Sequence, residues 1–278
     1  MLEVFSDRKI YKVITCYNIM ELIKNTIKVG NSAGVLLPRE WLGSKVRVIL
    51  EPLNLEKEVI EILIQEKVLG DVLGAYIVGS YARGEQTIES DIDVLIITGS
   101  INKKIKRGKY EIICVSREEL ASQIQKNILP ILPMIKEARI IINKELIRQY
   151  ASSKLTPKNL SYHLETTKSA MKVVEKDIEL SKEMDEKASD ATAYSLILRL
   201  RTLYIIQCLK HGKMWSKKDF LKLVNRVSGS TIAYERYLKS KNKDTGESKL
   251  PIEEAEKLMR YIDKNIREIE KWLQEKKD

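Results

Sequence analysis

Residues 75–96 read AYIVGSYARGEQTIESDIDVLI, and this stretch decides the fold of the central part of the chain. Its apolar run at 75–79 predicts a buried strand that ends in Gly79, and a second strand is predicted over 93–98. Side chains alternate between the two faces of a strand, so Asp91 and Asp93 are expected on the same face. Two neighbouring carboxylates repel each other unless a positive charge neutralises them. The spacing therefore predicts a paired-carboxylate site.

The residue types in this stretch favour binding of a metal ion and a phosphate. Carboxylate oxygens suit Mg²⁺, which completes its shell with phosphate and water. Gly79 allows a phosphate to approach the backbone closely, and the amides around Ser80, at the start of a short helix, can donate to it. Arg83 is the nearest cation that could offset phosphate charge; its alternative role is to cover the turn.

The pattern of Gly79-Ser80, ten residues, then Asp91-x-Asp93 resembles the motif of the minimal nucleotidyltransferases within the DNA polymerase β superfamily. The resemblance extends over about residues 60–150. It implies a polymerase β-like nucleotidyltransferase domain that moves a nucleoside monophosphate from ATP or another NTP to a hydroxyl acceptor and releases pyrophosphate. It also implies two Mg²⁺ ions held by three carboxylates. The third is expected on the following strand, where Glu111 stands, although the family more often has Asp there.

The predicted site therefore has a metal-binding and a nucleotide-binding part. Asp91, Asp93 and Glu111 are the predicted catalytic and metal-binding residues, while Gly79, Ser80 and Arg83 are predicted to contact the nucleotide. Glu118 and Glu119 are expected to be helix-start acids without a catalytic role. The resemblance allows two kinds of acceptor: a protein side chain, as in toxin-silencing antitoxins, or a small molecule, as in aminoglycoside-modifying relatives. The alternative function is a dimeric DNA-binding regulator in which the nucleotidyltransferase fold is a nucleotide sensor or scaffold.

Residues 27–50, IKVGNSAGVLLPREWLGSKVRVIL, form a second pattern of short β-like runs (27–29, 34–37 and 45–50) separated by turn residues. This segment is similar to the swapped-hairpin DNA-binding domain of AbrB and MazE type regulators. So small a hairpin pair cannot bury its own apolar face, so a homodimer is expected. Any DNA contact is expected from basic residues of the hairpin, namely Lys28, Arg39, Lys45 and Arg47. Dimerisation without DNA binding is the alternative, and residues 1–19 match no pattern.

The remaining periodicity predicts an α+β fold in three domains: a β-hairpin domain at 1–53, the nucleotidyltransferase domain at 54–152 and a helical bundle at 153–278. Further strands are predicted over 110–116 and 139–142. Helices are predicted over 55–69, 117–135, 159–184, 188–211, 216–227 and 252–276. The helical bundle is expected to bind a substrate or partner.

Composition limits the environment and the partners of the chain. Lys and Arg total 49 against 39 Asp and Glu, giving a net charge of +10, which favours nucleotide or polyanion partners. Ten basic residues lie between Lys210 and Lys243; a solvated helical face is the simpler interpretation, and nucleic-acid binding is the alternative. The three cysteines form no ligand cluster or disulfide framework, and no signal peptide or membrane span is expected. A cytoplasmic location is therefore predicted.

Overall fold

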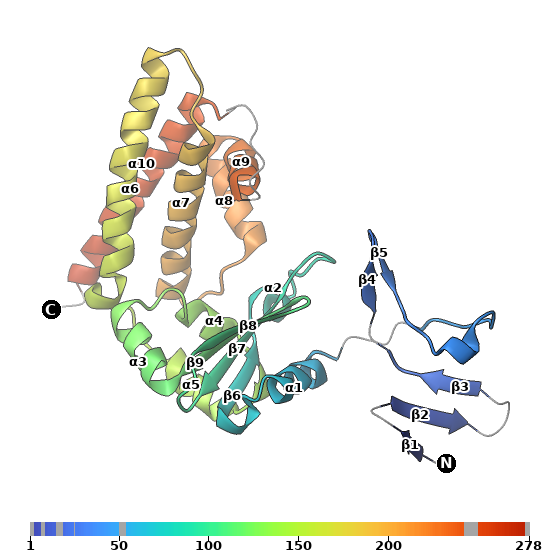
Figure 1. The fold of residues 1–278 in the computed structure, drawn as a ribbon. Helices are drawn as coiled ribbons and strands as arrows, with labels where there is room; N and C mark the ends of the chain where they lie inside the picture. The colour runs from blue at the N-terminus through green and yellow to red at the C-terminus, as the bar shows by residue number, and fades with distance from the viewer. Residues whose placement is uncertain are drawn as a thin grey trace. The chain divides into compact units, whose positions relative to one another are not determined.

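A computed structural model describes residues 3–6, 9–14, 19–24, 26–49, 54–241 and 250–275. Figure 1 shows the order of the helices and strands along the chain. The chain forms two compact units, Met1–Leu53 and Asn54–Asp278, each of which is described by itself.

The described part of the first unit consists of short strands and one 3-10 turn, Arg39–Trp41. An antiparallel sheet is formed by β1 (Glu3–Ser6), β2 (Lys9–Ile14) and β3 (Ile19–Leu22), a region for which the sequence predicted nothing. A hairpin follows, in which β4 (Ile27–Val29) and β5 (Ser32–Gly34) are joined by Gly30 and Asn31. Gly30 has a φ of +59°, as a two-residue hairpin turn requires.

Two of the predicted β-runs in this unit are wrong. Residues 35–38 and 44–49 have no regular secondary structure, and Leu50 lies outside the described residues. A strand needs a neighbour to satisfy its backbone groups, and within the described part of this unit nothing pairs with 44–49. Val48 remains 77% exposed and Val29 55% exposed, so the described residues of the first unit leave the apolar face of this segment exposed.

The second unit is built on a five-stranded sheet with the order β10-β6-β7-β9-β8. Its strands are β6 (Val72–Ile77), β7 (Ile92–Thr98), β8 (Lys103–Arg107), β9 (Tyr110–Ser116) and β10 (Arg139–Ile142). Only β7 and β9 run parallel; the other pairs are antiparallel. The four predicted strands are confirmed. Strand β8, KKIKR, was not predicted because lysines dominate it, as is common for a strand at the edge of a sheet.

Helices cover both faces of this sheet. On one face α1 (Leu55–Gln65) packs through Val59 and Leu63, while α3 (Arg117–Lys126), α4 (Leu132–Glu137) and α5 (Lys144–Ala151) cover the other. The helix predicted over 117–135 is confirmed at its start, since Ser116 caps α3, but it is wrong in its length, because α3 ends at Lys126. Proline lacks an N–H and disfavours a helical residue before it, so Pro130 separates α3 from α4.

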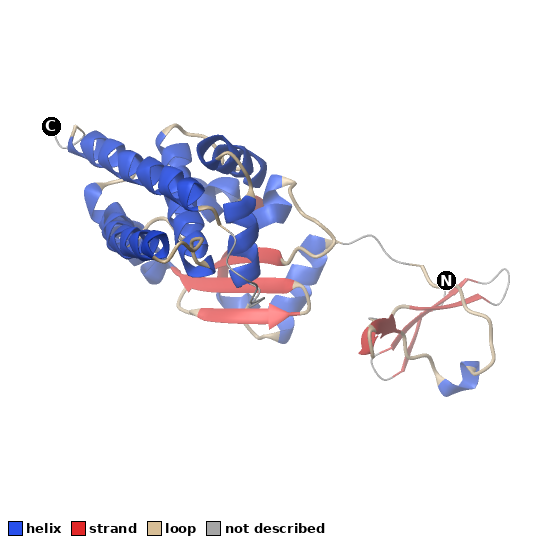
Figure 2. Cartoon of the chain, turned by 90° about the horizontal axis from the view of Figure 1, so that it is seen from above, coloured by secondary structure: helices blue, strands red, loops and turns tan. Residues whose placement is uncertain are grey.

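Long helices form the rest of the second unit (Figures 1 and 2). They are α6 (Pro157–Glu183), α7 (Asp190–Lys210), α8 (Lys217–Ser228), α9 (Ile232–Lys241) and α10 (Ile252–Gln274). Four were predicted, whereas α9 was not. Their apolar faces share one core, which also includes Ile128 and Leu132 beside α4. Together with the sheet they form the mixed α+β fold that the sequence predicted. Among the described helices, none is long and apolar enough to cross a bilayer.

Candidate active site

The sheet brings two of the predicted carboxylates together. Asp93 in β7 and Glu111 in β9 are direct partners in the parallel register, and neighbouring strands lie about 4.8 Å apart. Both residues lie on the same face of the sheet as Leu95 and Val115, which is the face that α3, α4 and α5 cover. Asp91 is exposed and comes just before β7, two residues from Asp93. All three carboxylates therefore lie at one end of the sheet.

Asp93 is held in an electrostatically unfavourable position. Its burial raises the pKa of the carboxyl, and the negative charges of Glu111, Asp91 and Glu137 raise it further, while Arg83 opposes them. The carboxylate packs against Gly79, where an added Cβ would lie 2.2 Å from Asp93 Oδ2. Gly79 also has a φ of +69°. Gly79 therefore has a second role besides allowing a phosphate to approach the backbone. Because it has no Cβ, it leaves room for the Asp93 carboxylate.

Glu111 is engaged by a lysine that the sequence analysis did not single out. Lys106 is its direct partner in the β8–β9 pair, and Lys106 Nζ donates to Glu111 Oε1 at 2.5 Å. The bond to Glu111 raises the pKa of Lys106. Glu118 and Glu119 begin α3 beyond the opposite end of β9, on the order of 20 Å from Glu111 at 3.3 Å per residue. This placement favours Glu111 as the third carboxylate.

Replacing Glu111 with Gln should leave NTP binding intact and slow transfer by about a hundredfold, because its proposed task is to hold the catalytic ion and accept the proton of the acceptor. Calorimetry with NTP and single-turnover rates measure the two effects separately. Glu118→Gln is the control and should transfer at the wild-type rate. If Glu111→Gln keeps full activity while Glu118→Gln or Glu119→Gln does not, Glu111 is not the third carboxylate.

The carboxylates suit a divalent metal ion in their chemistry. Asp91, Asp93 and Glu111 supply the hard oxygen donors that Mg²⁺ prefers, and the raised pKa of Asp93 shows negative charge that a cation would offset. Within the described residues, no three His, Cys, Asp or Glu side chains already form a metal-binding cluster. Glu111 is turned to Lys106 instead. A metal ion at this site would therefore compete with Lys106 for the Glu111 carboxylate.

Arg83 and Glu137 form a buried ion pair beside Asp93. Arg83 Nη1 donates to Glu137 Oε2 at 2.6 Å, and the two side chains are only 10% and 5% exposed. The other carboxylate oxygen, Glu137 Oε1, accepts the Gly79 N–H at 2.7 Å. Glu137 therefore fixes the turn after β6 and the short helix α2 (Gly79–Arg83) together. Arg83 covers this turn, which was the alternative role that the sequence allowed.

The segment between α7 and α8 docks on the same turn. The Arg83 guanidinium lies over the Trp215 ring at 4.1 Å, and that of Arg201 lies 4.9 Å from it. Glu85 pairs with Arg83 at 3.0 Å and accepts the Lys217 N–H at 3.0 Å. Burial alone would raise the pKa of Glu85, but hydrogen bonds from Arg83 and Ser216 outweigh it and lower the pKa. The first turn of α8 is thereby attached to the edge of the site.

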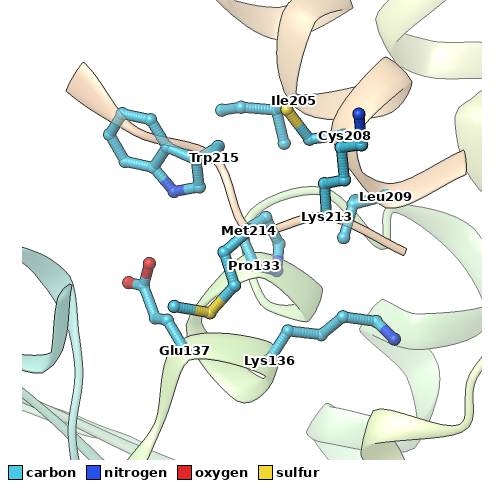
Figure 3. A pocket seen from close by; sticks show the side chains of 9 residues that line it. All are labelled: Pro133, Lys136, Glu137, Ile205, Cys208, Leu209, Lys213, Met214 and Trp215. Carbon is cyan, nitrogen blue, oxygen red and sulfur yellow. The ribbon is translucent and has the colours of Figure 1, made fainter. Parts of the chain in front are cut away.

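A hollow adjoins the buried ion pair (Figure 3). Its wall is mainly apolar and comes from α4, α7 and the segment before α8: Pro133, Ile205, Leu209 and Met214. Glu137 and Trp215 lie on one side in Figure 3, and the amines of Lys136 and Lys213 on the other. Because Glu137 belongs both to the hollow and to the Gly79 turn, the hollow is part of the site's surroundings.

Three residues of this site were missed by sequence reasoning. Lys106 lies on strand β8, which was not predicted. The only sign of it in the sequence is that it comes shortly before β9, the strand that carries Glu111. Glu137 and Trp215 both contact Arg83, although they lie 54 or more positions away from it in the sequence. Burial of an acid within an apolar helix, LPMIKE, is a sign that it has a charged partner, but it does not identify the partner.

Comparisons with known proteins support the motif region. Residues 56–158 match the family model described as Nucleotidyltransferase domain. No curated protein matches the chain. A nucleotidyltransferase-like protein from Exiguobacterium sibiricum 255-15 is 13% identical over 77% of this chain and 75% of its own, with a TM-score of 0.32. Spectinomycin adenyltransferase AAD(9) from Enterococcus faecialis, solved with ATP and spectinomycin, is 14% identical over 76% of this chain and 98% of its own, with a TM-score of 0.39.

All six predicted site residues, and also Lys106 and Glu137, lie inside the stretch that matches the family model. The two solved structures are too distant to indicate a substrate. Residues 56–158 of this chain are therefore similar to a nucleotidyltransferase domain.

Proposed function

We propose that this chain transfers a nucleoside monophosphate from an NTP to a hydroxyl group. The observation that carries the proposal is the direct pairing of Asp93 with Glu111, packed against the left-handed Gly79, inside the stretch that matches the nucleotidyltransferase model. In the reaction, the acceptor oxygen bonds to the α-phosphorus, the bond to pyrophosphate breaks, and Glu111 takes the acceptor proton.

Each proposed site residue has a distinct task. Asp91, Asp93 and Glu111 would hold the two divalent metal ions that the family resemblance implies. When bound, these ions would offset the charge of the phosphates and polarise the α-phosphate. Ser80, in the first turn of α2, is proposed to contact phosphate, and Gly79 keeps the turn close to Asp93. Arg83 is held by Glu137 and Glu85, so its guanidinium has a fixed orientation beside the turn.

The test separates nucleotide binding from transfer. The purified chain is titrated with ATP, GTP, CTP and UTP in a calorimeter with Mg²⁺, and then incubated with each α-labelled NTP and a cell lysate. We expect binding of at least one NTP and a labelled product that disappears when EDTA removes the metal. Lack of binding to all four NTPs would contradict the proposal.

We further propose that the first unit makes the protein a homodimer. The side chains of its apolar face, Ile27, Val29, Leu37, Val46 and Val48, are 39–77% exposed, which a second copy of the same surface would cover. Light scattering should give a dimer for the chain and a monomer after deletion of residues 1–52, with NTP binding retained. A monomer at micromolar concentration before the deletion would rule out this interface. Dimers after the deletion would place the interface elsewhere.

A further inference from the structure

A row of three charged side chains crosses the sheet at the candidate site. Asp93 of β7 is paired with Glu111 of β9, and Glu111 is paired in turn with Lys106 of β8. Direct partners on neighbouring strands point to the same face of a sheet and lie about 5 Å apart. Strand β8 is at the edge of the sheet, so Lys106 ends the row on the side of Glu111 that is away from Gly79. A cation therefore stands next to two proposed metal ligands.

Strand β8 is held at both of its ends from the opposite face of the sheet. Glu66, which follows α1, accepts a hydrogen bond from Lys103 Nζ at 2.6 Å with Oε2. Its Oε1 accepts from Arg107 Nε at 3.0 Å and from Arg107 Nη2 at 2.7 Å. Lys103 and Arg107 are the first and last residues of β8, and Lys106 lies between them on the other face. These bonds fix the strand that presents Lys106 to Glu111.

The turn after β8 is also attached to the segment that precedes Asp91. Lys109 Nζ donates to the carbonyl of Ile88 at 2.6 Å. The Lys106 ammonium interacts with two carboxylates: the bond to Glu111 raises the pKa of Lys106, and the negative charge of Asp91 raises it further. Lys106 therefore lies in the field of two of the three carboxylates that would hold the metal ions.

The bond between Lys106 and Glu111 is one that a metal ion can replace. The two side chains are 70% and 44% exposed, and exposed ion pairs contribute little to stability because water screens them. A lysine on its flexible stem can also turn its ammonium elsewhere without a movement of the backbone. The buried pair of Arg83 and Glu137 is the opposite case, with side chains that are 10% and 5% exposed. The site thus has one fixed cation and one that can change its partner.

The charge of Lys106 has opposite effects on a metal ion alone and on a nucleotide. It repels a divalent ion that approaches Glu111, so it weakens binding of the ion by itself. The phosphates of an NTP are anionic, and an ammonium released from Glu111 is attracted to them. Metal and nucleotide together satisfy both Glu111 and Lys106, whereas a metal ion alone leaves Lys106 beside it without a counter-charge.

We infer that Lys106 is a positioning residue that couples metal binding to nucleotide binding. Its ammonium holds Glu111 in the absence of nucleotide, and it turns to the phosphates when metal and NTP bind together. This inference rests on the proposed function. It makes Lys106 the residue that disfavours occupation of the site by a divalent ion without nucleotide.

The first measurement titrates the full chain with Mn²⁺ without nucleotide and follows the free ion by its paramagnetic signal. Lys106→Met should lower the Kd for Mn²⁺ by about tenfold, because it removes a positive charge about 5 Å from a divalent ion. Lys106→Arg keeps the charge and should stay within about twofold of the wild type. The matched control is Lys104→Met, on the same strand and the same face but opposite Ile113. It lies about 7 Å farther along the strand and should change the Kd by less than about threefold.

The second measurement repeats the titration with an analogue of a bound NTP that has a methylene group between the α- and β-phosphorus and cannot react. At equal free Mn²⁺, the analogue should strengthen metal binding by a factor roughly ten times larger in the wild type than in Lys106→Met. By the reciprocity of coupled binding, the metal should strengthen analogue binding by the same factor. In turnover, Lys106→Met should raise the KM for the NTP more than it lowers kcat.

The outcomes separate the role of Lys106 from the proposed function. If Lys106→Met and Lys104→Met bind Mn²⁺ equally, the inference is overturned. It is also overturned if the analogue strengthens Mn²⁺ binding by the same factor in the wild type and in Lys106→Met. In both cases, transfer from an NTP by the wild type would leave the proposed function standing. If neither Mn²⁺ nor any NTP binds to the wild type, the proposed function fails and the inference fails with it.

Discussion

Replacing Asp93 with Asn should lower the rate of nucleotidyl transfer by about three orders of magnitude while the protein stays folded. A carboxylate that holds a catalytic metal ion contributes several kcal/mol to the transition state, and each 1.4 kcal/mol is a factor of ten. Asn keeps the shape of the side chain beside Gly79 but not its charge. Single-turnover rates at saturating NTP and metal measure the effect. A folded Asp93→Asn protein with the wild-type rate would show that this motif is not the active site.

Asp93→Asn, which should lower the transfer rate, should not lower the stability of the fold when no metal is bound. Burial and the nearby charges of Glu111 and Asp91 raise the pKa of Asp93 in the folded state. Above that pKa the ionised carboxylate destabilises the fold, and this cost is relieved as the pH falls through it. In EDTA, Asp93→Asn should therefore melt at or above the wild-type temperature at neutral pH, and the difference should disappear in acid.

Asp263→Asn provides the control for both measurements. Burial also raises the pKa of Asp263, but this residue lies in α10, outside the motif. Its replacement should give a similar gain in melting temperature at neutral pH and leave the transfer rate unchanged. The comparison separates relief of a buried charge, which both variants share, from loss of a metal ligand, which only Asp93→Asn causes.

The sequence predicted those features of the site that depend on the alternation of side chains within one strand. Alternation along β7 predicted Asp93 on the face opposite Ile92 and Val94, and the structure has it there. Glu111 was expected as the third carboxylate from the family resemblance, and the structure pairs it with Asp93. The four predicted strands of the central sheet were confirmed because each has an uninterrupted apolar run.

What the sequence could not predict depends on tertiary contacts. Strand β8 has one buried residue, Ile105, and pairs along a sheet edge, so its lysines hide the pattern. Helix α9 carries a weakly amphipathic sequence that is fixed by packing of Tyr237 against Tyr194 of α7. The strand predicted over 45–50 needs a partner that the described part of one chain does not supply. In each case tertiary contacts decide the secondary structure, and the local sequence pattern alone does not predict it.

The partner of Arg83 is a further example, and it matters for function. The motif suggested a contact with phosphate, whereas the structure shows the guanidinium between two carboxylates and an indole. A cation with these partners is pre-oriented, so it needs little reorganisation when charge develops on the phosphates. The ion pair thus connects the rigidity of the turn with the proposed chemistry.

Replacing Glu137 with Ala should destabilise the second unit by about 3 kcal/mol, because it leaves the Gly79 N–H without its acceptor and takes from the buried Arg83 one of its two carboxylate partners. For a unit of this size the melting temperature should fall by about 6–12 °C. Glu145→Ala is the matched control, since it removes the acid of an exposed ion pair with Arg148 and should change stability by less than about 1 kcal/mol.

A second variant separates the charge from the packing. If the loss comes from an unbalanced buried charge, then the double change Arg83→Leu/Glu137→Leu should be more stable than Glu137→Ala alone, because it removes both ions of this pair while Glu85 keeps the Lys217 N–H. Transfer should remain impaired, because the guanidinium beside the Gly79 turn is gone. Thermal melting and single-turnover rates measured on the same samples test both outcomes. If Glu137→Ala melts within about 1 °C of the wild type, the ion pair does not stabilise the fold, and Glu137 cannot be what fixes the turn beside Asp93.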